Sequence, residues 1–268
     1  MGVSSVNMSE AARRAELKAA RRAAKARPMV TRTHIDCACV IHGAAYDWIY
    51  VQRLYNMLCR NLHLPVRMHV YTEHDRSVPP HMIKHCLTEW PGISGPKRSW
   101  WYKMQLFDPQ HFCGDLLYFD LDTVICSDIS WCVENPADDF WTLRDFRYLQ
   151  KPSYQGINSS LMWFNTQKFE WVWRNFCDAG VNNITHQYAG DQDYLGAMIR
   201  GHQCRLFESR RVASYRWQLC QGGWDFQRRR FLRPGIETII PPEVSVINFH
   251  GRPKPHQIHD PMITQYWI

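Results

Sequence analysis

The chain has 268 residues, of which 45% are hydrophobic and 21% are charged. These values are ordinary for a globular protein, and they exclude a chain that is disordered throughout. No run approaches the roughly 18 to 20 consecutive apolar residues of a membrane-spanning helix, so we do not expect an integral membrane protein.

The net charge of +7 is concentrated at the amino end of the chain. Residues 1–29 carry seven Lys or Arg against two Glu (+5), and the rest of the chain carries 25 basic against 23 acidic residues (+2). A nucleic-acid-binding surface across the folded part is therefore not expected. We predict that residues 1–30 form a basic, Ala- and Arg-rich extension, helical or disordered, ahead of one domain over 31–268.

The same extension bears on where the protein works. It lacks the apolar segment of a secretory signal, and none of the ten cysteines forms a CxxC pair, so we expect reduced thiols in a cytoplasmic protein. Peripheral contact of the basic extension with an anionic membrane is one reading, and a solvated helix is the alternative.

The predicted elements alternate between strand and helix along the chain. A strand over 36–42, an amphipathic helix over 47–61 and a strand over 66–72 are typical of a βαβ unit in a mostly parallel sheet. Four prolines make 76–99 a predicted loop. The later predicted elements are a short helix over 100–107, a strand over 116–120 that continues at 124–126, a strand over 160–164, helices over 169–177 and 191–200, and a strand over 244–249.

The sharpest chemical feature is a pair of carboxylates, Asp120 and Asp122, directly after the apolar strand. Ligands of open α/β sheets bind at the carboxyl ends of strands, and carboxylate oxygens suit Mg²⁺ and Mn²⁺. We therefore predict that Asp120 and Asp122 bind Mn²⁺ or Mg²⁺. A solvated turn is the alternative, and it is less favoured because unpaired carboxylates beside a core strand are costly.

A D-x-D-x-T pattern also occurs in aspartyl-nucleophile phosphatases, and Asp120, Asp122 and Thr123 satisfy it. Those enzymes carry the motif on the first strand of the domain, whereas here more than a hundred residues precede it. They also need a G-D-x-x-x-D pair, and the last position of that pattern is Leu195 in this chain. The phosphatase interpretation is therefore the weaker one.

Four further segments accompany the D-x-D motif, namely Ser99–Lys103, Asn158–Met162, Gly190–Asp193 and Asn248–His256. In order and spacing they resemble the nucleotide-sugar glycosyltransferases of the GT-A fold, nearest to the glycogenin-like and lipopolysaccharide galactosyltransferase-like group (family 8). The resemblance implies one α/β domain of GT-A type, with a Rossmann-like, mostly parallel central sheet flanked by helices. It also implies metal-dependent transfer of a hexose from a UDP-sugar to a glycan, lipid or protein acceptor, with retention of configuration.

The resemblance assigns roles to residues around the donor. Val40, Ile41, His42 and Tyr46 would hold the nucleotide base and ribose, and a core aromatic is the alternative for Tyr46. Lys103 would lie near the phosphates, with a surface lysine as the alternative, and Asp120 would also take part in binding the donor.

On the sugar side, Asn158 would bind hydroxyl groups, and Asp191 and Gln192 would face the reacting centre. A turn asparagine and a helix N-cap are the alternatives for Asn158 and Asp191.

The C-terminal segment matches the family pattern H-x-x-G-x-x-K-P-W only in part. Gly251 and Lys254 are in place, where they would meet the diphosphate, but Asn248 stands where a metal-binding His is expected. His256 stands where Trp is expected. We predict that His250 supplies the third metal ligand, because imidazole suits Mn²⁺ better than a carboxamide does. The departure at Asn248 also leaves open a nucleotide-sugar or glycan-binding protein of this fold that has no turnover.

Overall fold

Strand, helix and strand open the fold in the predicted order. The computed structural model describes residues 32–93, 98–220, 224–225, 228, 230–231 and 237–268, of which His34–Ile268 form one compact unit. The predicted basic extension over 1–30 lies outside the described residues. Strand β1 (Ile35–Val40) and strand β2 (Val66–Thr72) pair in parallel, and helix α2 (Trp48–Asn61) connects them.

Helix α2 begins and packs as its sequence dictates. Asp47 is the N-cap, and its carboxylate accepts a hydrogen bond from the Ile49 amide at 3.1 Å. Residues one turn apart form its apolar stripe, so that Val51, Leu54 and Leu58 are fully buried. Burial of each leucine contributes about 1.5–3 kcal/mol. The helix is thereby fixed against one face of the sheet.

The central sheet has seven strands in the order β3-β2-β1-β4-β7-β6-β8, and four of its six pairings are parallel. Strand β7 is the exception, because it runs antiparallel to both of its neighbours. The remaining strands of this sheet are β3 (Ile83–Cys86), β4 (Asp115–Phe119), β6 (Phe140–Arg144), β7 (Ile157–Asn165) and β8 (Cys204–Leu206).

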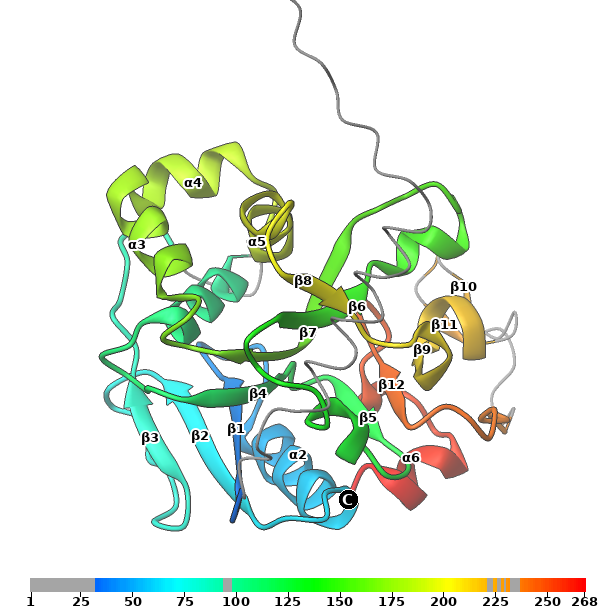
Figure 1. Cartoon of the computed structure of the whole chain (residues 1–268). Helices are drawn as coiled ribbons and strands as arrows, with labels where there is room; N and C mark the ends of the chain where they lie inside the picture. Colours follow the sequence, from blue (N-terminus) through cyan, green and yellow to red (C-terminus); the bar gives the residue numbers. More distant parts are fainter. Residues whose placement is uncertain (1–31, 94–97, 221–223, 226–227, 229, 232–236) are drawn as a thin grey trace, which may run out of the picture. The chain divides into compact units, whose positions relative to one another are not determined.

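Helices cover both faces of this sheet. Alternate residues of β4 show the division, because Leu117 and Phe119 belong to the core cluster that contains α2, and Leu116 and Tyr118 belong to the opposite one. Figure 1 shows α3, α4 and α5 on one side of the sheet and α2 and α6 on the other. The helices not yet bounded are α3 (Glu170–Ala179), α4 (Val181–Gln187), α5 (Asp191–Ile199) and α6 (Pro261–Tyr266).

Two sequence predictions of elements need correction. The predicted loop 76–99 contains the edge strand β3, which the periodicity concealed because its side chains are largely exposed. The predicted continuation at 124–126 is β5 (Thr123–Ile125), which leaves the central sheet. It pairs with β12 (Val246–Asn248), and β12 pairs with β9 (Val212–Ser214), in a separate three-stranded sheet. Strands β6, β8 and β9 and helices α4 and α6 were not predicted.

Short segments complete the described chain. None of its described helices is long and apolar enough to cross a membrane. The short helical segments and strands are η1 (Ser99–Phe107), η2 (Ser130–Cys132), η3 (Phe146–Leu149), η4 (Ser209–Arg211), η5 (Tyr215–Leu219), η6 (Pro255–Gln257), β10 (Trp224–Asp225) and β11 (Arg230–Phe231).

A set of charged and histidine side chains lies at the amino end of β1, and we call it the Asp36 cluster (His34, Asp36, Arg67, His69 and His85). Arg67 Nη2 and His69 Nε2 lie 2.8 and 2.7 Å from the carboxylate oxygens of Asp36. His69 Nδ1 lies 2.8 Å from His85 Nε2. Burial alone would raise the pKa of Asp36, but the hydrogen bonds from His69 and Arg67 outweigh it and lower that pKa.

Candidate functional site

The D-x-D motif occupies the turn between the two sheets. Asp120 follows β4, and its amide donates to the Ser160 carbonyl of β7 at 2.8 Å. Asp122 precedes β5, and its carbonyl accepts from the Phe249 amide after β12 at 3.1 Å. The turn is thus tied to both sheets at the carboxyl end of β4, where the rules of open α/β sheets place ligands.

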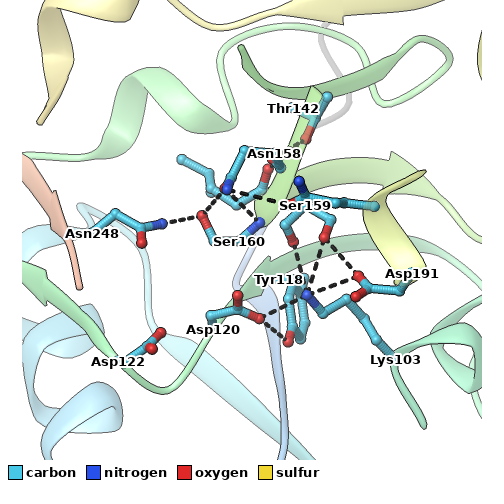
Figure 2. Close-up of polar contacts among 12 residues, drawn as sticks. Lys103, Tyr118, Asp120, Asp122, Thr142, Asn158, Ser159, Ser160, Asp191 and Asn248 are labelled. Carbon is cyan, nitrogen blue, oxygen red and sulfur yellow. Dashed lines mark hydrogen bonds and ion pairs between the residues drawn. The ribbon is translucent and has the colours of Figure 1, made fainter. Parts of the chain in front are cut away.

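A buried lysine joins Asp120 to the first turn of α5. Lys103 Nζ lies 2.9 Å from Asp120 Oδ1 and 3.1 Å from Asp191 Oδ2, and it donates to Ser159 Oγ at 3.1 Å (Figure 2). Burial opposes the charged form of Lys103, but the two carboxylates outweigh it and raise its pKa above the ordinary value. Lys103 is therefore charged and committed to these carboxylates, so the surface-lysine alternative is wrong.

We call Lys103, Asp120, Asp122, Asp191 and Lys254 the DxD cluster. Burial raises the pKa of Asp120, although Lys103 opposes this, and the Tyr118 hydroxyl donates to Asp120 Oδ1 at 2.6 Å. Asp122 binds Lys254 and accepts from the Tyr46 hydroxyl at 3.0 Å. Three carboxylates thus face two ammonium groups, so the cluster has an excess of negative charge.

The sugar-side candidates also come together. Gly190, not Asp191, is the N-cap of α5, and the Asp191 carboxylate accepts from the Ser159 hydroxyl at 2.6 Å. Gln192 Nε2 donates to Asp145 Oδ2 at 3.0 Å, and Gln192 Oε1 faces Asn158 Nδ2 at 3.4 Å. The N-cap alternative for Asp191 is therefore wrong, and Asn158 lies within strand β7 rather than in a turn.

His250 has other partners. Its Nε2 lies 2.7 Å from Ser214 Oγ, and its ring stacks on Phe146 and meets Trp217 edge-on. Burial lowers the pKa of His250 to about 4, so the ring is neutral at pH 7. Within the described residues, no group of three or more His, Cys, Asp and Glu is arranged to hold a metal ion. His250 is thus not brought together with Asp120 and Asp122 as a ligand set.

Asn248 is the polar residue that approaches the two aspartates from β12. It pairs with Thr123 of β5, and its Nδ2 donates to Ser160 Oγ (Figure 2). Its Oδ1 is buried and has no hydrogen-bond partner among the described residues. Asp120, Asp122 and Asn248 therefore offer oxygen atoms only, which is the donor type of a hard divalent cation.

The predicted nucleotide residues do not form one set. Ile41 is 1% exposed, so its side chain is core. The His42 ring stacks on Tyr102 with centroids 3.9 Å apart, and its Nε2 lies 3.1 Å from Glu89. Val40 is half-buried at the end of β1. Tyr46 alone among the four reaches the DxD cluster, and burial and Asp122 raise the pKa of its hydroxyl.

Gly251 and Lys254 lie close to the same cluster. Gly251 has φ of +74°, and a Cβ there would stand 2.8 Å from Arg216 Nη1. Another residue would therefore be both strained and crowded at this position. Lys254 binds Asp122, which places its ammonium beside the D-x-D motif.

Two functional features escaped the sequence reading. Asp145 directly follows β6 and receives the Gln192 amide, but the sequence did not indicate β6 and so gave no reason to single out Asp145. Glu73 directly follows β2 and accepts from the Gly43 amide, and Arg76 Nη2 donates to the Gly43 carbonyl at 2.7 Å. These two side chains fix the turn that carries Tyr46. No sequence pattern indicated that long-range contact.

Comparison with known proteins supports the fold. No protein-family model matches the sequence, and no curated protein matches it either. Among solved structures, the galactosyltransferase LgtC in complex with donor and acceptor sugar analogs shares 16% identity and a TM-score of 0.57, over 82% of this chain and 89% of that chain. An active-site variant of LgtC gives 13% identity and a TM-score of 0.58 with the same coverage.

The glycosyltransferase GlyE of Streptococcus pneumoniae TIGR4 is also similar, with 15% identity and a TM-score of 0.56. The match covers 84% of this chain and 56% of that chain. At these identities the likeness concerns the fold, and the predicted resemblance is confirmed at that level. The described chain has the α/β fold of the GT-A glycosyltransferases, with a mostly parallel central sheet flanked by helices.

Proposed function

We propose that this protein is a metal-dependent glycosyltransferase that moves a hexose from a UDP-sugar to an acceptor, with retention of configuration. The observation that carries the proposal is the DxD cluster, in which three carboxylates face two ammonium groups at the carboxyl end of β4. Such an excess of negative charge favours a bound cation, and a cation there would meet phosphate oxygens of a donor.

The candidate metal ligands are Asp120 and Asp122, and their carboxylates fit Mn²⁺ or Mg²⁺. A divalent cation, when bound, supplies electrostatic stabilisation of a departing diphosphate. His250, the predicted third ligand, is instead held by Ser214.

The chain's own cations would add to that stabilisation. Lys254 lies beside Asp122 and could turn its ammonium towards the terminal phosphate of a donor. Lys103 has a different role, because Asp120 and Asp191 already hold its ammonium. We infer that Lys103 fixes the distance between the metal motif and the amino end of α5, and so orients both carboxylates.

Polar groups on β7 and α5 would serve the sugar. As the sugar–phosphate bond breaks, positive charge develops on the sugar carbon, and a nearby amide oxygen or carboxylate can stabilise it. Gln192 Oε1 is suited to this, because Asp145 holds the Nε2 side of the same amide. Asn158 contacts Gln192 and would bind hydroxyl groups of the sugar, and Asp191, which precedes Gln192 in α5, would face the reacting centre with it.

The experiment is donor hydrolysis, which needs no acceptor. The purified chain is incubated with a panel of UDP-sugars in Mn²⁺ or in EDTA, and released UDP is measured. We expect UDP release from one donor in Mn²⁺ only, with no release by Asp122→Ala. UDP binding in Mn²⁺ without release, even when glycan acceptors are added, would instead support a binding protein of this fold. Absence of UDP binding would refute the proposal.

A further inference from the structure

Asn248 places in the candidate site a buried oxygen that has no partner among the described residues. Asn248 is 2% exposed, and its Oδ1 accepts no hydrogen bond from any described residue. An unsatisfied buried acceptor is costly, so a native protein seldom keeps one without a use. The question is therefore why the Asn248 side-chain amide is oriented with its oxygen free and its nitrogen bonded to Ser160.

The cause is a directional series of hydrogen bonds that starts at Asp145. Its carboxylate can only accept, so Gln192 must present Nε2 to it and turn Oε1 towards Asn158 Nδ2. Asn158 Oδ1 is fixed independently, because the Ser160 amide donates to it at 3.1 Å. Both ends thus give Asn158 the same orientation.

Ser160 transmits this orientation to Asn248. Its hydroxyl has one proton, which it donates to Asn158 Oδ1, so its oxygen must accept from the next group. That group is Asn248 Nδ2. The amide of Asn248 therefore directs Oδ1 away from Ser160. In the reverse orientation Ser160 would have to donate its only proton to Asn248, and its oxygen would then face the Asn158 oxygen with no proton between them.

The free oxygen is directed towards the two aspartates. Asn248 pairs across the small sheet with Thr123, the residue after Asp122, and its hydrogen-bond partner Ser160 receives the Asp120 amide. Figure 2 shows Asn248 Oδ1 on the side of the residue on which Asp120 and Asp122 lie. Its backbone and its side chain therefore tie Asn248 to both ends of the D-x-D turn.

We propose that Asn248 Oδ1 is the third protein ligand of the divalent cation, so that the site consists of oxygen donors only. The inference rests on the proposed function and replaces His250 in the ligand set. The His250 imidazole is directed to Ser214 and held between Phe146 and Trp217. An all-oxygen site favours Mg²⁺, Mn²⁺ and Ca²⁺, whereas a histidine ligand would improve binding of Co²⁺, Ni²⁺ and Zn²⁺.

The test measures cation binding directly. Mn²⁺ is titrated into the full chain with UDP present, and free Mn²⁺ is followed by electron paramagnetic resonance. Asn248→Leu should weaken Mn²⁺ binding by at least about tenfold, since the loss of a ligand costs no less than that of an outer-shell partner. Asn248→Asp keeps an oxygen and should retain the affinity. His250→Gln, the matched control, should show no comparable loss.

Asn248→His adds an independent readout, because the ratio of Co²⁺ to Mg²⁺ affinity should rise if position 248 meets the cation. The ligand assignment would be overturned if Asn248→Leu bound Mn²⁺ as tightly as the unaltered protein. It would also be overturned if His250→Gln lost about tenfold in Mn²⁺ affinity. Either result would leave the proposed function intact. If Asn248→Leu does not fold, an unchanged Co²⁺ to Mg²⁺ ratio in Asn248→His overturns the assignment on its own. Failure of the unaltered protein to bind Mn²⁺ with UDP would instead refute the proposed function.

Discussion

Two charged clusters lie at opposite ends of the parallel strands, and they are built on different principles. In the Asp36 cluster one carboxylate receives hydrogen bonds from Arg67 and His69, and His69 uses both of its ring nitrogens. In the DxD cluster three carboxylates share two lysines. In the Asp36 cluster the carboxylate is paired with protein donors, whereas in the DxD cluster the carboxylates outnumber the ammonium groups.

This difference suggests that the Asp36 cluster serves stability and the DxD cluster serves ligand binding, although both lie on the same sheet. A cluster whose groups satisfy one another stabilises the native state, and its loss should reduce stability alone. A cluster with excess negative charge is unfavourable without a cation, so loss of one of its carboxylates should reduce cation binding more than stability. Substitutions in the two clusters should therefore affect different measurements.

The largest effect is expected from a matched pair of aspartate variants. Asp120→Ala should reduce metal-dependent UDP release at least about 10²-fold, as loss of a single electrostatic group in an active site does. Asp36→Ala should leave UDP release intact and lower the free energy of unfolding by about 1–3 kcal/mol, because His69 loses its partner. Donor hydrolysis measures UDP release, and urea denaturation measures the free energy of unfolding. Equal loss of UDP release in both variants would break the comparison.

The next effect concerns the buried lysine. Lys103→Met leaves Asp120 and Asp191 without their shared counter-ion, which should cost about 3–5 kcal/mol in a denaturant titration. Arg174→Met is the control, since the Arg174 side chain in its ion pair with Glu170 is 64% exposed and its loss should cost about 1 kcal/mol or less. If the two variants were equally stable, Lys103 could not be the structural link that we infer.

A third effect is a pH dependence that belongs to the Asp36 cluster. Burial, followed by the neighbouring His69 and His111, lowers the pKa of His85 to about 4, against about 6.5 in the unfolded chain. Between these values the unfolded state binds a proton that the folded state does not, so the free energy of unfolding should fall as pH drops from 6.5 to 4. His85→Gln, whose amide does not titrate, should flatten this slope. An identical slope in both proteins would show that His85 contributes nothing to it.

The smallest effect is expected at the rim of the same cluster. The Arg67 side chain is 45% exposed, so Arg67→Ala should lower the free energy of unfolding by about 1 kcal/mol or less. Thermal unfolding of this variant beside Asp36→Ala would order the contacts of Asp36 by burial. A larger loss in Arg67→Ala than in Asp36→Ala would mean that Arg67 acts through groups other than Asp36.

The sequence predicted those parts of the molecule that local patterns determine. The βαβ unit has clear periodicity and a capped helix, and Asp120 and Asp122 follow the apolar residues 116–119 of strand β4. Strands β3 and β6 lacked such a pattern, since β3 is largely exposed and β6 alternates irregularly. Both strands are stabilised by pairing with strands distant in the sequence, and local sequence patterns do not reveal such pairing.

Within the candidate site, residue types could be predicted but partners could not. Tyr46 and Lys254 contact Asp122, and Lys103 joins Asp120 to Asp191, but the sequence did not indicate that Lys103 binds two carboxylates. The choice of His250 over Asn248 rested on ligand chemistry alone. The orientation of the two side chains favours Asn248 instead. Ser160 holds the Asn248 amide so that its oxygen is free, whereas the His250 imidazole is directed to Ser214.

The reversed direction of β7 has a consequence for how this fold can diversify. Because β7 runs against β4 and β6, its first residues lie beside the last residues of both strands, and the connection between β6 and β7, residues 145–156, begins and ends at the site. Insertions there lengthen a hairpin without crossing the sheet or its cores. A lineage could thus acquire new donors or acceptors by altering one loop, while the strands that carry the charged groups stay in register.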